Sequence, residues 1–398
     1  MTLEPHHVDY LRAIPERVRE GGMFGLDHVV QALLCALLTD GHVLLEGNPG
    51  LGKTALVHAM AKAIGIGDGA VGRIQFTPDL MPADITGTKM PDEDGGKEWR
   101  FRPGPIFKEL LIADEINRAT PKTQAAMLEA MGEGQVTVAG DTKPLRKTEP
   151  VGPYREVMTP FMVMATQNPI DQEGTFELPE AQSDRFMMKI RMRMPDAEVL
   201  SQIVLKAIAP YRESKKGASD AEQRAEGLRM LHEASVAVLS MRLSPVVLAH
   251  IVNLVLATNG QWDQLVGLST RRSGELRGWL DGKVTYPFGP RAASAPGRGA
   301  LAWAAVALTA PDKADVAADQ APRGLAAVLV PVLRHRIRVS DGVQGFAGSG
   351  AEVADGVDSF LRELAVRAAP DLAVGGLAAG YSDRFKAAMD EAAETVKL

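Results

Sequence analysis

The sequence has a single cysteine, few aromatic residues and no long apolar run. Cys35 is the only cysteine among 398 residues, so an intramolecular disulfide is excluded and a reducing compartment is expected. No segment reaches the roughly 20 apolar residues that a membrane-spanning helix needs. Residues 1–10 lack a basic stretch followed by an apolar one. We therefore expect no signal peptide and predict a cytoplasmic location.

Charge and histidine patterns exclude further classes of protein. The net charge of -6 gives no overall attraction for nucleic acid, and none of the eight histidines has a partner at metal-site spacing on one helix face. A basic cluster, formed by Arg334, His335, Arg336 and Arg338, is interpreted as a solvated or inter-subunit face rather than a nucleic-acid site. With 45% hydrophobic and 24% charged residues, the composition is that of an ordinary globular protein.

Apolar periodicity in the first half predicts strands that alternate with helices. Helical spacing of apolar residues covers 26–38, and a second helix is predicted from Pro121, with Thr120 as its N-cap, to Gly132 or Gly134. Residues 135–138 are expected to form one arm of a hairpin. Three short apolar runs indicate buried strands, at 42–46, 110–113 and 161–166. This alternation predicts an α/β fold with a parallel sheet covered on both faces.

The second half is rich in Ala, Leu and Arg and has few strand-like runs. We predict a helical domain there, with loops at 213–220 and 283–299 and two further helices near 357–367 and 382–396. The predicted domains are therefore a nucleotide-binding core at 1–194, a helical lid at 195–340 and a C-terminal helical extension at 341–398.

A glycine-rich loop between the first predicted strand and a helix has the pattern of a phosphate-binding loop. Its eight residues are Gly47, Asn48, Pro49, Gly50, Leu51, Gly52, Lys53 and Thr54. Glycines let backbone N–H groups turn toward phosphate oxygens, where side chains would collide. The Lys53 ammonium supplies charge to the β- and γ-phosphates, and the Thr54 hydroxyl is a Mg²⁺ ligand. The loop thus predicts ATP and Mg²⁺ as cofactors.

Polar residues end the other two predicted strands. Asp114 and Glu115 follow the second, where the first acid would hold Mg²⁺ and the second would activate the attacking water. Asn168 follows the third and could orient that water. Because carboxyl ends of parallel strands share one edge of a sheet, these groups are expected to meet.

Several segments resemble the MoxR family of AAA+ ATPases. The resemblance extends from about Phe24 to Arg338, and it is dense through Phe186 and sparse afterwards. The segments that carry it are 73–87, 104–107, 113–119, 165–169, 173–186 and 331–337. It implies a three-layer α/β P-loop domain with a parallel sheet, a smaller helical lid, and assembly into a ring, typically a hexamer.

The resemblance also implies roles for residues. It makes 47–54 the Walker A loop, Asp114 and Glu115 the Walker B acids, and Asn168 sensor 1. Arg185 falls where the family has an arginine finger, which would act on the γ-phosphate held by a neighbouring subunit.

Two places depart from the family pattern. The stretch 146–158 is longer than the family usually has before the third strand, so the shape of the hairpin there is open. Sensor 2 could be Arg291 or Arg298, since both contexts fit in part. We favour Arg298 because Pro296 is expected to cut short a helix that begins at Arg291.

The predicted function is Mg²⁺-dependent ATP hydrolysis by a ring that remodels or matures a client protein. The resemblance implies a chaperone-like role, with an adaptor that carries a von Willebrand factor A-like domain as a frequent partner. Two alternatives remain: a motor stimulated by nucleic acid, which the acidic net charge disfavours, and a regulatory module that binds ATP with little turnover.

Overall fold

The computed structural model describes residues 3–48, 50–91, 99–151, 156–167, 176, 178–208, 220–307, 321–344, 350–374 and 380–395. The chain forms two compact units, and the division between them falls inside α1, β11 and α8. We call residues 9–186 and 190–236 the core unit, and residues 1–8, 187–189 and 237–398 the C-terminal unit. Residues 197–236 group with the core unit, and residues 341–398 group with residues 237–340. The domain boundaries at 194 and 340 stay predictions.

Helices and strands alternate through the core unit. Its helices, including the two that cross the division, are α1 (Pro5–Glu20), α2 (Asp27–Leu38), α3 (Lys53–Ala63), α4 (Pro82–Thr86), α5 (Pro121–Glu133), α6 (Glu180–Ser183), α7 (Ala197–Ile208) and α8 (Asp220–Leu239). The strands are β1 (Val43–Glu46), β2 (Val71–Gln75), β3 (Gly87–Pro91), β4 (Trp99–Pro103), β5 (Leu110–Asp114), β6 (Gln135–Val138), β7 (Asp141–Pro144), β8 (Thr148–Pro150), β9 (Glu156–Met158), β10 (Met162–Gln167) and β11 (Met188–Arg191).

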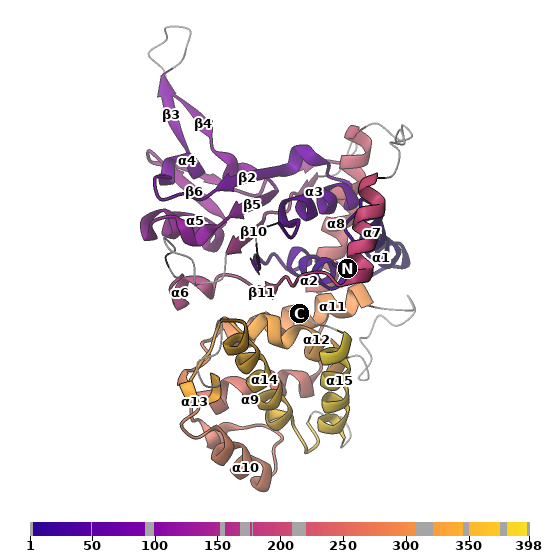
Figure 1. The fold of residues 1–398 in the computed structure, drawn as a ribbon, viewed down its shortest axis with the longest axis vertical. Coiled ribbons are helices and arrows are strands. Elements are labelled where there is room, and N and C mark those ends of the chain that lie inside the picture. Colours follow the sequence, from indigo (N-terminus) through magenta and orange to yellow (C-terminus); the bar gives the residue numbers. More distant parts are fainter. Residues whose placement is uncertain are drawn as a thin grey trace. The chain divides into compact units, whose positions relative to one another are not determined.

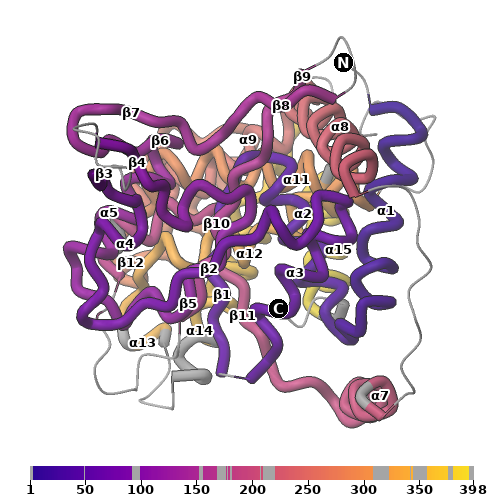
Figure 2. Tube along the Cα trace, turned by 90° about the horizontal axis from the view of Figure 1, so that it is seen from above, coloured from indigo at the N-terminus to yellow at the C-terminus, as the bar shows by residue number. Residues whose placement is uncertain are grey.

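Five strands form one sheet in the order β11-β1-β10-β5-β2. The pairs β1–β10, β10–β5 and β5–β2 are parallel, so their carboxyl ends share one edge. Helices α2 and α3 lie on one side of this sheet and α4 and α5 on the other (Figures 1 and 2). Buried apolar residues, among them Ile106, Leu128 and Phe186, pack into a hydrophobic cluster of the core unit. The predicted α/β fold with a parallel sheet is confirmed.

Most local predictions in the core unit hold. The expected strands correspond to β1, β5 and β10, and the helix after the glycine-rich loop is α3. Helix α5 starts at Pro121 after Thr120 and ends before Gly134, which has a left-handed backbone. Residues 135–138 form β6, which pairs with β7 in an antiparallel hairpin. The longer stretch before β10 adds a second antiparallel pair, β8–β9.

The C-terminal unit is helical, as predicted for this part of the chain. Its elements are α9 (Pro245–Thr258), α10 (Thr270–Leu280), β12 (Val284–Tyr286), α11 (Arg291–Ala307), α12 (Ala321–Leu333), β13 (Arg338–Val339), α13 (Asp341–Gln344), α14 (Gly350–Ala368) and α15 (Tyr381–Thr395). Helices α14 and α15 contain the two predicted C-terminal helices. None of the helices in the described part of the chain is long and apolar enough to cross a membrane.

The loop predicted at 283–299 is wrong, and so is the helix break predicted at Pro296. The segment 283–299 is not a loop: it holds β12 and the first half of α11, which runs from Arg291 straight through Pro296. A proline removes one backbone donor, but the buried alanine-rich face of α11 continues the helix on both sides of it. The argument that favoured Arg298 over Arg291 therefore fails.

The basic cluster at 334–338, predicted to be a solvated or inter-subunit face, is buried at two of its four basic residues, whereas Arg338 is exposed. Arg334 and Arg336 are each only 6% exposed. Arg334 Nη2 lies 2.9 Å from Asp358 Oδ2 on α14, and Arg336 Nη1 donates to the carbonyl oxygen of Met187 at 3.1 Å. Buried charges require such partners, because burial removes them from water. Two of the four basic groups therefore stabilise the interior of the unit and offer no surface to nucleic acid.

Candidate active site

The glycine-rich loop joins β1 to α3 with a backbone that its glycines make possible. Gly50 and Gly52 have left-handed φ angles of 87° and 75°, a region in which other residues are strained. A Cβ on Gly47 would stand 2.7 Å from the carbonyl oxygen of Met192, so only glycine fits there. Helix α3 begins immediately afterwards, at Lys53. The glycine-rich loop therefore leads directly into a helix N-terminus, where unpaired backbone N–H groups favour an anion.

Lys53 is directed back over the loop. Its Nζ donates to the carbonyl oxygen of Gly47 at 2.5 Å. Partial burial lowers the pKa of Lys53, and the negative charges of Asp114, Glu115 and Glu46 oppose that shift. Asp114 ends β5, Glu115 follows it directly and Glu46 ends β1, so the lysine and the acids act on one another at the same edge of the sheet.

Asp114 is the last residue of β5 and is held on both carboxylate oxygens. The hydroxyl of Thr166, on the neighbouring strand β10, donates to Oδ1 at 3.3 Å, and Arg73 Nε on β2 donates to Oδ2 at 2.8 Å. Only 8% of Asp114 is exposed, whereas the Arg73 side chain is 55% exposed. The carboxylate is therefore rigidly placed, with a movable cation on its outer side.

Glu115 has a left-handed backbone, with φ of 55°, which turns the chain sharply after β5. Its N–H donates to the Thr166 hydroxyl at 2.9 Å. Its carboxylate accepts a hydrogen bond from Gln75 Nε2 at 3.0 Å and pairs with Arg118 Nε at 3.2 Å. An unusual backbone that the surroundings hold in place is typical of functional sites.

The third strand end carries a further polar contact. Gln167, the last residue of β10, donates from Nε2 to Glu46 Oε1 at 2.6 Å, and Arg191 Nε lies 3.4 Å from Glu46 Oε2. Asn168, the predicted sensor 1, and Pro49 of the loop lie outside the described residues.

The two predicted arginines lie in different units. Arg185 follows α6 in the core unit, and its Nε stands 3.4 Å from where a Cβ on Gly132 of α5 would be. Arg298 is exposed on α11 of the C-terminal unit, and Arg291 starts that helix.

Sequence reasoning assigned no role to Arg73, Gln75 or Thr166. The first two lie two residues apart on β2, and alternate residues of a strand face the same side. Two polar residues at alternate positions of a strand, Arg73 and Gln75, could therefore have indicated side chains that face the acid pair at 114 and 115.

The donor set suits Mg²⁺. Asp114 and Thr54 offer oxygen atoms, the ligands that this hard cation takes, and Asp114 already attracts one cationic group. A Cβ on Gly50 would meet nothing within 4 Å, so the loop leaves open space beside its backbone. These residues fit a nucleotide phosphate with its metal ion.

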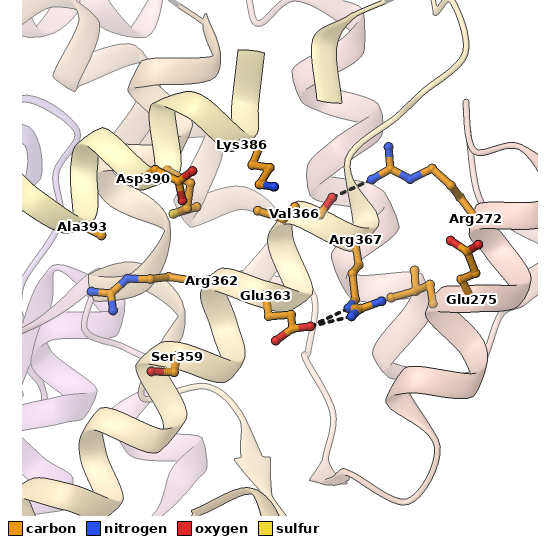
Figure 3. Close-up of a pocket in the computed structure, with 12 residues that line it drawn as sticks. Arg272, Glu275, Ser359, Arg362, Glu363, Val366, Arg367, Lys386, Asp390 and Ala393 are labelled. Atoms are coloured by element: carbon orange, nitrogen blue, oxygen red, sulfur yellow. Dashed lines mark hydrogen bonds and ion pairs between the residues drawn. The ribbon is translucent and has the colours of Figure 1, made fainter. Parts of the chain in front are cut away.

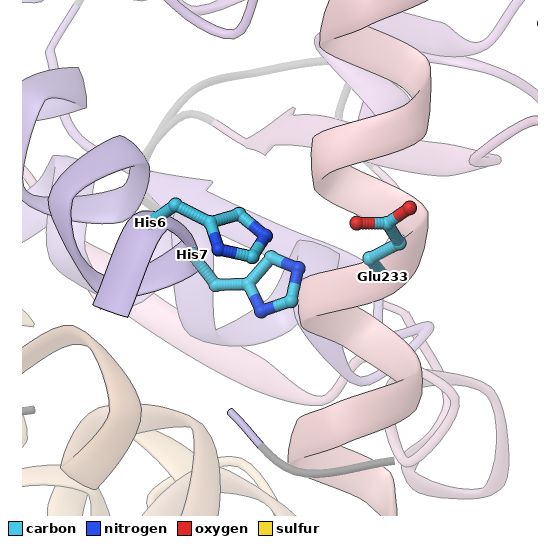
Figure 4. A group of neighbouring side chains, drawn as sticks. All are labelled: His6, His7 and Glu233. Atoms are coloured by element: carbon cyan, nitrogen blue, oxygen red, sulfur yellow. The ribbon is translucent and has the colours of Figure 1, made fainter. Parts of the chain in front are cut away.

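A second group of ionisable side chains is drawn in Figure 4. It consists of His6 and His7, whose ring centroids are 4.0 Å apart, and Glu233. The histidines belong to the C-terminal unit, whereas Glu233 belongs to the core unit and pairs with Arg229 at 3.0 Å. Because the group is divided between the two units, we assign it no metal.

Comparison with known proteins bears on the family of this part of the chain. Residues 42–188 match the model of the ATPase family associated with various cellular activities (AAA). The chain is 46% identical over 180 residues to the chaperone MoxR1 of Mycobacterium tuberculosis, covering 45% of this chain and 44% of that protein. It is 51% identical over 173 residues to the uncharacterized protein YeaC of Bacillus subtilis, covering 44% and 49%. The chain thus spans about half the length of the curated relatives it matches.

A solved structure covers more of the chain. The crystal structure of a candidate ATPase from Cytophaga hutchinsonii has a TM-score of 0.65 at 29% identity, covering 88% of this chain and 94% of that one. The fold and the strand-end site therefore define an AAA-type P-loop ATPase domain. Within that class, the matched part of the chain is similar to proteins of the MoxR family of AAA+ ATPases.

Proposed function

We propose that this protein is a Mg²⁺-dependent ATPase that assembles into a ring and remodels a client protein. The observation that carries the proposal is the meeting of Lys53, Asp114 and Glu115 at one sheet edge, where the charges of the two acids act on the lysine. A phosphate cradle without the acids would fit a binding module, and acids without the cradle would fit a solvated turn.

Each residue has a chemical task in this proposal. Lys53 binds the β- and γ-phosphates, and Thr54 with Asp114 would hold Mg²⁺, which neutralises phosphate charge when bound. Glu115 accepts a proton from the attacking water, and Asn168 orients that water. Gln75 and Arg118 fix the position of the Glu115 carboxylate before nucleotide arrives.

Ring assembly supplies what a single subunit lacks. Arg185 would stabilise the transition-state charge on ATP held next door, an effect of about 10³–10⁵ in rate where arginine fingers have been characterised. Arg291 becomes as good a candidate for sensor 2 as Arg298, because it starts α11. The client, and an adaptor with a von Willebrand factor A-like domain, are proposed from the name of the chaperone relative and from the family resemblance.

The test is the substitution Glu115→Gln. General-base catalysis contributes about 10²–10⁴ in rate, so phosphate release should fall at least 100-fold while ATP stays bound. Glu129→Gln, on the exposed face of α5, is the matched control and should release phosphate at the wild-type rate. Unchanged turnover in Glu115→Gln would contradict the assignment and favour a regulatory module.

A mixing experiment tests the action of Arg185 between subunits. Arg185→Ala and Lys53→Ala should each be inactive alone, and mixing them should restore activity at interfaces that combine an intact loop with an intact arginine. No rescue at any ratio would count against the arginine finger. Stimulation of wild-type turnover by DNA, lost as salt rises, would instead support the nucleic-acid motor.

A further inference from the structure

The C-terminal unit has a cavity of its own, lined by none of the residues assigned to the nucleotide site. Helices α10, α14 and α15 enclose about 540 Å³ (Figure 3). We call it the C-terminal groove. Its floor is apolar, formed by Leu276, Val366 and Met389. Leu276 and Met389 are at most 3% exposed, so they support the floor from the packed interior, and the half-buried Val366 offers its apolar surface to the cavity.

The rim of the C-terminal groove carries more free positive than free negative charge. Of its acids, Glu363 is held by Arg367 at 2.6 Å and Glu275 by Arg271 at 3.0 Å. The Arg367 guanidinium also lies over the ring of Trp279, 5.0 Å from its centroid. Both acids are therefore neutralised by neighbours, and Arg367 is anchored.

Three cations remain for a ligand. Arg272 donates through Nη2 to the carbonyl oxygen of Val366 at 2.8 Å, which orients its planar head. Arg362 and Lys386 have no ion-pair partner among the described residues, and they face one remaining acid, Asp390. The uncompensated charge of this cavity is thus positive.

The arrangement of these cations selects the kind of anion. Figure 3 shows Arg272, Lys386 and Arg362 coming from three different helices and spread along the groove rather than aimed at one point. A small anion such as phosphate needs converging donors and would fill a fraction of 540 Å³. A chain of separate carboxylates with apolar side chains between them matches both the spread cations and the apolar floor.

We propose that the C-terminal groove binds an acidic peptide segment of a partner protein, with its carboxylates on Arg362 and Lys386 and an apolar side chain against Val366. Arg272 is a preoriented third contact, because a guanidinium held by one hydrogen bond loses less freedom when it binds. This site is independent of the ATPase proposal.

The test uses the full-length protein and a fluorescent 12-residue peptide in which Glu and Asp alternate with Leu. Fluorescence anisotropy should give a Kd below about 1 mM, and this Kd should rise as the salt concentration rises. Arg362→Glu and Lys386→Glu should each weaken binding at least tenfold. Arg277→Glu, on the exposed face of α10, makes the same charge change outside the groove and should not. Unchanged thermal unfolding of each variant shows that it folds.

Three further probes separate the ligand classes. A matched peptide with Lys in place of the acids should not bind, and inorganic pyrophosphate and a 12-nucleotide single-stranded DNA should not displace the acidic peptide. No binding of the acidic peptide, or binding that ignores Arg362→Glu and Lys386→Glu, would overturn the proposal. Binding of pyrophosphate or DNA that is as tight as that of the acidic peptide, or tighter, would show that the groove does not select a peptide. A Met389 methyl signal in NMR that moves with the peptide would place the ligand on the floor.

Discussion

Acid should destabilise the core unit through His42, which lies just before β1. The ring is buried: Val163 N donates to Nδ1 at 3.1 Å, and Nε2 lies 3.2 Å from the carbonyl oxygen of Met131. Because Nδ1 accepts a hydrogen bond, the neutral ring carries its proton on Nε2 and satisfies both partners. A second proton would set two N–H groups against each other, and burial lowers the pKa of His42 from 6.5 to about 4.

The sign of the effect follows from linkage. The unfolded chain binds the proton more tightly than the folded one, so the stability is fully present above pH 6.5 and is lost as pH falls toward 4. At about 1.4 kcal/mol per pKa unit, the loss amounts to about 3 kcal/mol. His250 is buried in the C-terminal unit, and burial lowers its pKa to about 3. Acid should therefore destabilise the C-terminal unit as well.

The assay must isolate His42 from other titrating groups. Urea unfolding of the wild type and of His42→Asn, measured at pH 7.5 and pH 4.5, gives the difference. Asn keeps an acceptor for Val163 N but does not titrate, so the variant should be less stable at pH 7.5 and should lose about 3 kcal/mol less on acidification. An identical pH dependence in both proteins would refute the reasoning.

Three other substitutions test separate parts of the structure. Asp358→Asn removes the charge that faces the buried Arg334, and thermal or urea unfolding of the C-terminal unit should show a cost of about 3 kcal/mol or more; a change near zero would contradict a supporting ion pair. Gly52→Ala forces a side chain into a left-handed backbone, so it should weaken ATP binding and cost about 1 kcal/mol in stability, and wild-type ATP affinity would contradict the strained-loop account. Arg73→Ala frees one oxygen of Asp114, so nucleotide binding should reach half-saturation at lower Mg²⁺; an unchanged or higher Mg²⁺ requirement would show that Arg73 does not compete with the metal.

Local patterns made much of the core unit predictable. Residues 43–45 before the loop are apolar, and most residues after Gly52 are good helix formers, so β1, the loop and α3 follow from neighbours in sequence. The acids at 114 and 115 could be placed at the same edge because parallel strands share their carboxyl ends. Domain boundaries, location in the cell and the roles of individual site residues stay predictions.

Contacts between distant residues explain what the sequence did not reveal. Strand β2 is a five-residue edge strand with a weak apolar pattern, so its pairing with β5, which puts Arg73 on Asp114, was not apparent. The sequence alone favours a surface position for Arg334, because its ion-pair partner Asp358 lies 24 positions later in the chain. Pro296 looks like a helix terminator until the buried alanines around it are seen to pack.

The most direct test of the central claim is to measure ATP binding and phosphate release on one purified sample across a range of protein concentrations. The account predicts that ATP binds with Mg²⁺, that phosphate is released, and that the rate per chain rises with concentration as neighbouring subunits contribute Arg185. A protein that neither binds ATP nor releases phosphate, at concentrations where it oligomerises, would contradict it.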